Sequence, residues 1–251
     1  MTRVNKLVIV SFTMLLTAVG LTVYHYHPYK IEHIGYTKKI WAHRVNSLEK
    51  LDYTQNKYTG IEVDIVYDTL THTFDVTHPP TPSVGLNLET YLGKIHKPLG
   101  LWLDFKNLNT SNAKAALNRL QQITEKHNIN EKHVIVESQH PKYLQQFEAI
   151  GFQTSYYLPS RLHTFPQEKL TIKIDEIQSN ITLFPTTYIS TNIEDYNVIS
   201  THFPEQKKLL WSLFTTYNKN IYANYQLTRK ALKDNVVFVL LIRVNKDVGH
   251  R

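Results

Sequence analysis

Cysteine is absent from this sequence of 251 residues, which excludes disulfide bridges, thiolate metal sites and a cysteine nucleophile. Long basic runs are absent too, because the lysines and arginines are scattered and form no zinc-finger or RNA-binding pattern. We therefore expect no nucleic-acid partner. The formal net charge of +7 at pH 7 nevertheless favours anionic partners, such as phosphate groups or anionic lipid.

Charged side chains are also missing from one stretch near the N-terminus, between Leu7 and Tyr24. This length approaches the roughly 20 apolar residues that a membrane-spanning helix needs. Arg3 and Lys6 precede the stretch, and cations at this position favour a cytoplasmic N-terminus. The pattern predicts an N-terminal hydrophobic helix that anchors the protein in a membrane.

This helix divides the chain into two parts. We expect residues 1–27 to form the anchor and a short spacer, and residues 28–251 to form one domain on the extracytoplasmic side, either periplasmic or extracellular. A secretory signal is the alternative, because the small residues Ala18 and Gly20 would allow cleavage there and release a secreted protein.

The rest of the chain alternates between strand-like and helix-like patterns. Apolar residues recur with helical spacing in residues 112–128, and a second helix-like stretch covers 140–151. Alternation of this kind predicts an α/β fold with a mostly parallel sheet, and eight strands suit a compact (β/α)8 TIM barrel. A doubly wound sheet is the alternative. The eight apolar, β-rich runs are residues 39–44, 60–68, 100–107, 133–139, 152–159, 186–191, 207–214 and 235–244.

Two carboxylates lie inside the second of these runs. Glu62 and Asp64 are two residues apart, so their side chains point to the same face of a strand. They are costly to bury unless a cation compensates them, and their oxygens suit a hard divalent ion such as Mg²⁺ or Ca²⁺. Two solvated acids on an exposed face are the alternative. The apolar flanks of the run indicate a central strand and therefore favour a metal site.

Other polar residues end or interrupt the neighbouring runs. His43 and Arg44 end the first run, and His78 stands directly before two prolines. Asp104 and Lys106 are again two residues apart within an apolar run. In a (β/α)8 barrel these strand ends converge on one mouth, where active sites of this fold lie.

The order of these motifs resembles the glycerophosphodiester phosphodiesterase group of phospholipase-C-like phosphodiesterase barrels. The segments WAHRVNS, IEVDIVYD, THPP, LNLETYL and LWLDFKN look most similar to the menorin branch, and the likeness is dense from Ile40 to Asn107. Three features depart from these patterns. Arg44 replaces the alanine usual in the menorin branch, Asp104 replaces the glutamate usual in the phosphodiesterases, and the insertion after His78 is missing, which should leave the mouth less covered.

The resemblance implies cleavage of a phosphodiester, and the chemistry of these residues suits that reaction. A divalent cation held by Glu62, Asp64 and Asp104 would neutralise the phosphate. Arg44 offers a planar fork of donors to phosphate oxygens, and Lys106 offers a point charge. The resemblance implies a glycerophosphodiester or a lipid head group as substrate.

Two histidines are expected to divide the proton transfers, with His43 as the base and His78 as the acid. Two other functions stay open. The protein could be a membrane-tethered binding module without turnover, or a lyase of the sphingomyelinase-D type that leaves a cyclic phosphate.

Three further residues have two interpretations each. Asn46 and Ser47 could contact metal or substrate, and Ser47 would equally serve as a helix N-cap. Glu137 either lines the mouth or is a solvated strand end.

Overall fold

The computed structural model describes residues 3–26, 30–212 and 220–244, with side chains described from residue 8 onward except in 21–26. Eight parallel strands form a closed barrel, because β1 pairs with both β9 and β2. A ninth strand, β3, runs antiparallel to β2 outside the barrel. The predicted (β/α)8 TIM barrel is confirmed, and each predicted run overlaps one barrel strand. The strands are β1 (Ile40–His43), β2 (Gly60–Asp68), β3 (Thr73–Val76), β4 (Gly100–Phe105), β5 (Val134–Ser138), β6 (Gln153–Tyr157), β7 (Tyr188–Asn192), β8 (Lys208–Ser212) and β9 (Val237–Arg243).

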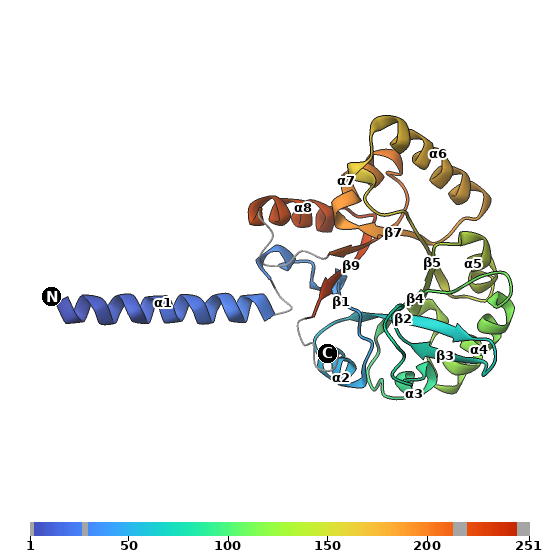
Figure 1. Ribbon diagram of the computed structural model, residues 1–251, viewed down its shortest axis with the longest axis horizontal. Helices are drawn as coiled ribbons and strands as arrows, with labels where there is room; N and C mark the ends of the chain where they lie inside the picture. Colours follow the sequence, from blue (N-terminus) through green and yellow to red (C-terminus); the bar gives the residue numbers. More distant parts are fainter. Residues whose placement is uncertain (1–2, 27–29, 213–219, 245–251) are drawn as a thin grey trace.

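Helices surround the barrel on its outer side (Figure 1). Both predicted helices are present, as α4 and α5. The helices are α1 (Arg3–Tyr26), α2 (Leu48–Thr54), α3 (Leu88–Leu92), α4 (Ala113–Lys126), α5 (Pro141–Glu148), α6 (Gln167–Leu183), α7 (Tyr196–His202) and α8 (Ile221–Lys233), and the short 3-10 helices are η1 (Ile31–His33), η2 (Thr37–Lys39), η3 (Glu131–His133), η4 (Leu162–Thr164) and η5 (Ile193–Asp195).

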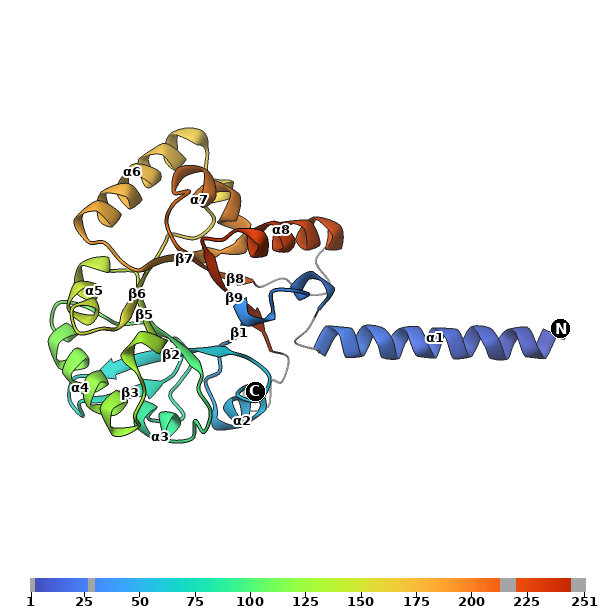
Figure 2. The ribbon, with the colours of Figure 1, turned by 180° about the vertical axis from the view of Figure 1, so that it is seen from behind.

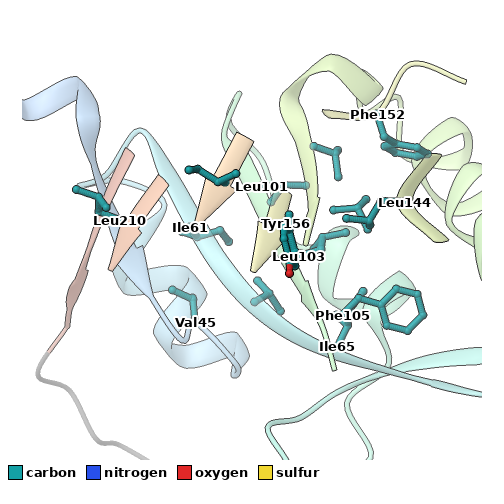
Figure 3. Close-up of a cluster of buried hydrophobic side chains, with 14 of the residues drawn as sticks. Val45, Ile61, Ile65, Leu101, Leu103, Phe105, Leu144, Phe152, Tyr156 and Leu210 are labelled. Carbon is teal, nitrogen blue, oxygen red and sulfur yellow. The ribbon is translucent and has the colours of Figure 1, made fainter. Parts of the chain in front are cut away.

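The larger of two hydrophobic cores lies between the strands and the surrounding helices. Alternate residues of each strand point outward into it, as Ile61 and Ile65 do on β2. Leu144 of α5 is among the helical residues that pack against them, and Figure 3 shows part of this layer. Because strand side chains alternate, the residues between Ile61 and Ile65 must include some that face the barrel interior.

The smaller core fills the interior of the barrel and consists only of strand residues. It contains Trp102, Ile135, Tyr188, Leu209, Val239 and Leu241, with Trp41 and Trp211 packed against it. The Trp41 ring occupies the space beside Gly60 and Gly100, where a Cβ atom at either glycine would overlap the indole. The two glycines are therefore required by the tryptophan.

We expect Gly100→Ala to destabilise the barrel by about 1–3 kcal/mol, the usual cost of overpacking a filled core. Urea unfolding of the wild type and the variant measures this change. The double variant Gly100→Ala/Trp41→Leu should lose less stability than the sum of the losses in the two single variants, because the ring that would meet the new methyl group is gone. Additive effects of the two substitutions would contradict this account of the contact.

The N-terminal helix α1 projects away from the barrel (Figures 1 and 2). Its described apolar side chains, such as Val8 and Phe12, are exposed. Within the described residues, no helix is long and apolar enough to span a bilayer. The predicted boundary between residues 27 and 28 lies outside the described residues.

Candidate metal and phosphate site

Three neighbouring strands bring acidic side chains into one row inside the barrel. Asp64 of β2 pairs in register with Asp104 of β4, and Asp104 pairs with Glu137 of β5. Glu62 lies two residues before Asp64 and shares its inward face. The predicted same-face arrangement on β2 therefore places both carboxylates inside the barrel, and the alternative of a solvated face is wrong, because Glu62 is only 2 % exposed and Asp64 only 1 %.

Glu62, Asp64 and Asp104 form a cluster that suits a cation. Each offers one oxygen, and these oxygens all lie within 4.8 Å of one another. Burial is the main cause that raises the pKa of Glu62 well above its ordinary value, and Asp64 and Asp104 raise it further. Burial likewise raises the pKa of Asp104, with Asp64 adding to the effect.

The hydrogen bonding and charge of the cluster suit a hard divalent ion. Oε1 of Glu62 is buried and has no hydrogen-bond partner among the described residues. Among the ion pairs of the described chain, only one ammonium group, that of Lys106, pairs with the cluster, and it pairs with Asp64 and Asp104 but not with Glu62. Oxygen ligands with uncompensated negative charge are the donor set that Mg²⁺ and Ca²⁺ prefer.

Lys106 forms ion pairs with two of the three carboxylates in the cluster. Its ammonium group is 2.7 Å from Oδ1 of Asp64 and also pairs with Asp104. Burial lowers the pKa of Lys106, but the two carboxylates outweigh this effect and raise the pKa above its ordinary value. The lysine therefore stays charged and supplies a fixed positive charge at the barrel mouth.

His43, the last residue of β1, is buried beside the cluster. Its Nε2 lies 3.6 Å from Oε2 of Glu62, and its Nδ1 has no hydrogen-bond partner among the described residues. Burial, with help from the charge of Arg44, lowers the pKa of His43 to about 3. The imidazole is therefore neutral near pH 7 and has a nitrogen free to accept a proton.

Arg44 connects the cluster to the second histidine. Its backbone has a φ of 52°, a left-handed conformation, and its backbone N–H donates to Oε2 of Glu62 at 2.6 Å. Its guanidinium group donates to Nε2 of His78 at 2.8 Å. Because a guanidinium has no acceptor, this nitrogen of His78 must be unprotonated in the contact. The exposed Arg44 thus positions one histidine and one proposed metal ligand.

Asn46 and Ser47 have separate structural roles. The Asn46 side-chain amide donates to Oδ2 of Asp64 at 2.6 Å, and its carbonyl oxygen accepts from the Asp64 backbone N–H at 3.0 Å. Ser47 is the N-cap of α2 and accepts from the backbone N–H of Lys50 at 3.2 Å. The N-cap interpretation of Ser47 is confirmed, and Asn46 orients a carboxylate of the cluster.

We expect Asn46→Ala to weaken binding of Mg²⁺ or Ca²⁺ by about 10–100-fold, the usual effect of removing a partner that orients a metal ligand. Isothermal titration calorimetry measures this affinity. Ser47→Ala is the matched control, because it should cost about 0.5–2 kcal/mol of stability through loss of the cap while leaving cation affinity unchanged. Equal cation affinity in Asn46→Ala and the wild type would show that Asn46 does not orient a ligand.

Glu137 is a member of the row that the sequence left undecided. It is 1 % exposed and accepts a hydrogen bond from the hydroxyl of Ser190 on β7. Burial, followed by the charge of Asp104, raises its pKa well above the ordinary value. The solvated interpretation of Glu137 is therefore wrong. Ser190 lies 53 residues after Glu137 in the sequence, so no local sequence pattern could predict this hydrogen bond.

An aromatic pair stands at the ends of β6 and β8. Tyr157 and Trp211 have nearly parallel rings, 16° apart in orientation, with centroids separated by 6.3 Å. Burial raises the pKa of Tyr157 to about 12, and Glu137 and Asp104 add to this shift. Tyr157 also lines a cavity of about 680 Å³ beside the mouth, together with residues of α5 and α6 such as Tyr143 and Glu176.

Comparison with solved structures identifies the architecture. A chain assigned as a glycerophosphodiester phosphodiesterase from Galdieria sulphuraria matches with a TM-score of 0.58 and 17 % identity, covering 82 % of this chain and 93 % of that one. The glycerophosphodiester phosphodiesterase from Agrobacterium tumefaciens matches with a TM-score of 0.52 and 11 % identity, covering 82 % and 95 %. A phosphodiesterase from Oleispira antarctica, solved with the product sn-glycerol-3-phosphate, matches with a TM-score of 0.55 and 11 % identity, covering 83 % and 94 %.

No family model and no curated protein matches the chain. The solved structures nevertheless show that the fold is shared with glycerophosphodiester phosphodiesterases. The resemblance to the menorin branch has no support from these comparisons.

Proposed function

We propose that this protein is a metal-dependent phosphodiesterase that cleaves a glycerophosphodiester or a related lipid-derived substrate. One observation carries the proposal. Two buried carboxylates and a partly buried one converge within 4.8 Å in a barrel whose fold is shared with such enzymes, and the cationic and imidazole groups that phosphodiester cleavage needs surround them.

The proposed binding groups for phosphate are Arg44 and Lys106. Glu62, Asp64 and Asp104 would hold Mg²⁺ or Ca²⁺, which when bound would neutralise phosphate charge and polarise a phosphoryl oxygen. Arg44 is exposed and presents its fork of donors at the mouth, where phosphate oxygens can accept from it.

The two histidines are proposed to share the proton transfers. His43 is the proposed base for the attacking water, because it ends β1 beside the carboxylates, with its Nε2 3.6 Å from Oε2 of Glu62. His78 donates one to the leaving alcohol oxygen. The Arg44 contact requires an unprotonated Nε2 on His78, so a phosphate that draws Arg44 away would also leave His78 free to carry a proton.

The cavity of about 680 Å³ beside the mouth is the proposed place for the alcohol portion of the substrate. Its volume lies within the range typical of small-molecule sites. Tyr157 links the two places, because it lines this cavity and lies close enough to Glu137 and Asp104 for their charges to raise its pKa.

The test is a screen of phosphodiesters with the full chain, with and without Mg²⁺ or Ca²⁺. Cation-dependent release of a phosphomonoester, with oxygen from labelled water in the product, would support hydrolysis. A cyclic phosphate without the label would indicate the lyase reaction. If every diester stays intact while glycerophosphodiesters bind, the protein is a binding module and the enzymatic proposal is wrong.

The location of the protein is a separate proposal, made from the uncharged stretch between Leu7 and Tyr24. We expect the full chain to sediment with membranes after cell lysis and a chain that begins at Pro28 to stay in the supernatant. Fractionation and N-terminal sequencing measure both. A mature protein that begins near Leu21 would replace the anchor with a cleaved signal.

A further inference from the structure

A second cavity lies at the end of the barrel opposite the carboxylate row. It has a volume of about 310 Å³, and its lining residues stand at or just before the N-terminal ends of their strands. Gly100, for example, begins β4, and Tyr188 begins β7. The interior core that includes Trp102 and Leu209 fills the barrel between this cavity and the mouth.

The walls of this N-terminal cavity are mainly apolar. Trp41, Leu99, Ile135, Phe238 and Val239 line it. Two of its polar groups bond to each other, because the hydroxyl of Tyr188 donates to Oε1 of Gln153 at 2.9 Å. The inner part of the cavity therefore suits an apolar group rather than a polar one.

The side chain of Phe238 shows that the apolar lining reaches the surface. It is 41 % exposed and contacts Tyr188 edge-on, with ring centroids 5.4 Å apart. Lys207 holds its ammonium group 5.4 Å from the centre of the Phe238 ring. An apolar chain that enters the cavity would thus pass directly beside a cation.

Further cations stand at the opening. Lys38 and Lys132 belong to the lining and are exposed. Within the described part of the chain, no ion pair involves Lys38, Lys132 or Lys207. An apolar hollow with unpaired ammonium groups at its rim is complementary to a molecule with an apolar tail and an anionic head.

We propose that this cavity binds a single-chain anionic amphiphile, with the hydrocarbon chain against Trp41 and Val239 and the anionic head between Lys38 and Lys132. The site is distinct from the carboxylate row and does not depend on the proposed phosphodiesterase activity. Each methylene that leaves water contributes roughly fourfold in affinity, so a chain of moderate length suffices for measurable binding.

The test uses the full chain and three ten-carbon probes of different charge: decanoate, decanol and decyltrimethylammonium. Isothermal titration calorimetry below the micellar range should show decanoate bound most tightly and the cationic probe most weakly. Lys38→Gln/Lys132→Gln should weaken decanoate about tenfold, because an exposed ion pair contributes up to roughly fivefold and two are removed. Decanol binding should hardly change.

Two controls isolate the cavity. Lys114→Gln/Lys169→Gln removes the same charge from exposed positions on α4 and α6 and should leave decanoate affinity unchanged. Val239→Phe fills the cavity and should abolish binding of decanoate and decanol there, with the melting temperature checked in parallel. The helix α1 is present in every variant, so its own binding of amphiphiles cancels in the differences.

The proposal is overturned if the three probes bind equally, or if both double lysine variants weaken decanoate to the same extent. These outcomes use no enzymatic measurement, so they cannot be confused with failure of the proposed phosphodiesterase activity. The substituted lysines are exposed, so these variants should fold. They therefore test the proposal even if Val239→Phe does not fold.

Discussion

His43→Ala should lower the rate of phosphodiester cleavage by about 10²–10⁴-fold, the usual loss when a general acid or base is removed. The fold and cation affinity should persist, because no hydrogen bond joins the His43 side chain to another described residue and its Nε2 only approaches Oε2 of Glu62 at 3.6 Å. Steady-state kinetics and cation titration of the same preparation measure the two properties. His202→Ala, at an exposed position of α7, is the control and should behave as the wild type.

His78→Ala should lose activity on the same scale with an alkyl leaving group, yet recover part of it with p-nitrophenyl esters. A p-nitrophenolate leaves without a proton, so it bypasses the missing acid, whereas it cannot replace a missing base. Recovery in His43→Ala instead would exchange the two roles. If neither substitution slows any diester that the wild type cleaves, these histidines are not catalytic and the proposed mechanism fails.

Glu62→Gln and Asp64→Asn should each weaken binding of Mg²⁺ or Ca²⁺ by about 100-fold or more, because each removes an anionic ligand rather than an outer partner. The wild type should gain about 2.7 kcal/mol of stability at a cation concentration 100 times the Kd. Thermal unfolding with and without cation measures the gain, and Asp52→Asn on the exposed face of α2 is the control. An unchanged melting temperature of the wild type in both cations would refute the metal site.

The gain in stability from a cation should also rise with pH. The folded-state pKa values of Glu62 and Asp104 are raised, so without metal these carboxyls stabilise the fold at low pH and lose that contribution as the pH rises through the raised values. A bound cation requires the ionised forms and therefore releases protons. The increase in melting temperature should be larger at pH 8 than at pH 5, and calorimetry in two buffers of different ionisation enthalpy should detect the released protons.

His43 has the opposite linkage. Its pKa falls from 6.5 to about 3 on folding, so its contribution to stability is present above pH 6.5 and is lost as the pH falls toward 3. Comparison of the pH dependence of unfolding in the wild type and His43→Ala separates this contribution from that of the carboxyls.

Local sequence patterns predicted the parts of the site that lie on one strand or at one strand end. Glu62 and Asp64 share a face because strand side chains alternate, and this rule needs no tertiary information. The eight barrel strands were likewise identifiable as apolar runs. The predicted barrel placed Asp64 and Asp104 at the same mouth. It did not predict that they pair in register, because the register of two strands depends on the whole barrel.

Contacts between distant segments could not be predicted in the same way. The hydrogen bond from Ser190 to Glu137 joins β7 to β5, and neither residue lies in a distinctive motif. Helices α6 and α8 lacked a clear pattern as well. Ile172 of α6 is exposed while Ile174 and Ile177 are buried, which blurs the contrast between the two faces of the helix.

The in-register row formed by Asp64, Asp104 and Glu137 has a consequence for how this protein can change. Neighbouring strands lie about 4.8 Å apart, so backbone hydrogen bonds alone set the spacing of these carboxylates. The segment that follows β6, which lines the cavity beside Tyr157, carries none of these carboxylates. An exchanged or lengthened loop after β6 would therefore change the space beside Tyr157 without moving the carboxylates. Selectivity for the proposed alcohol portion could then change while the proposed cation site stays the same.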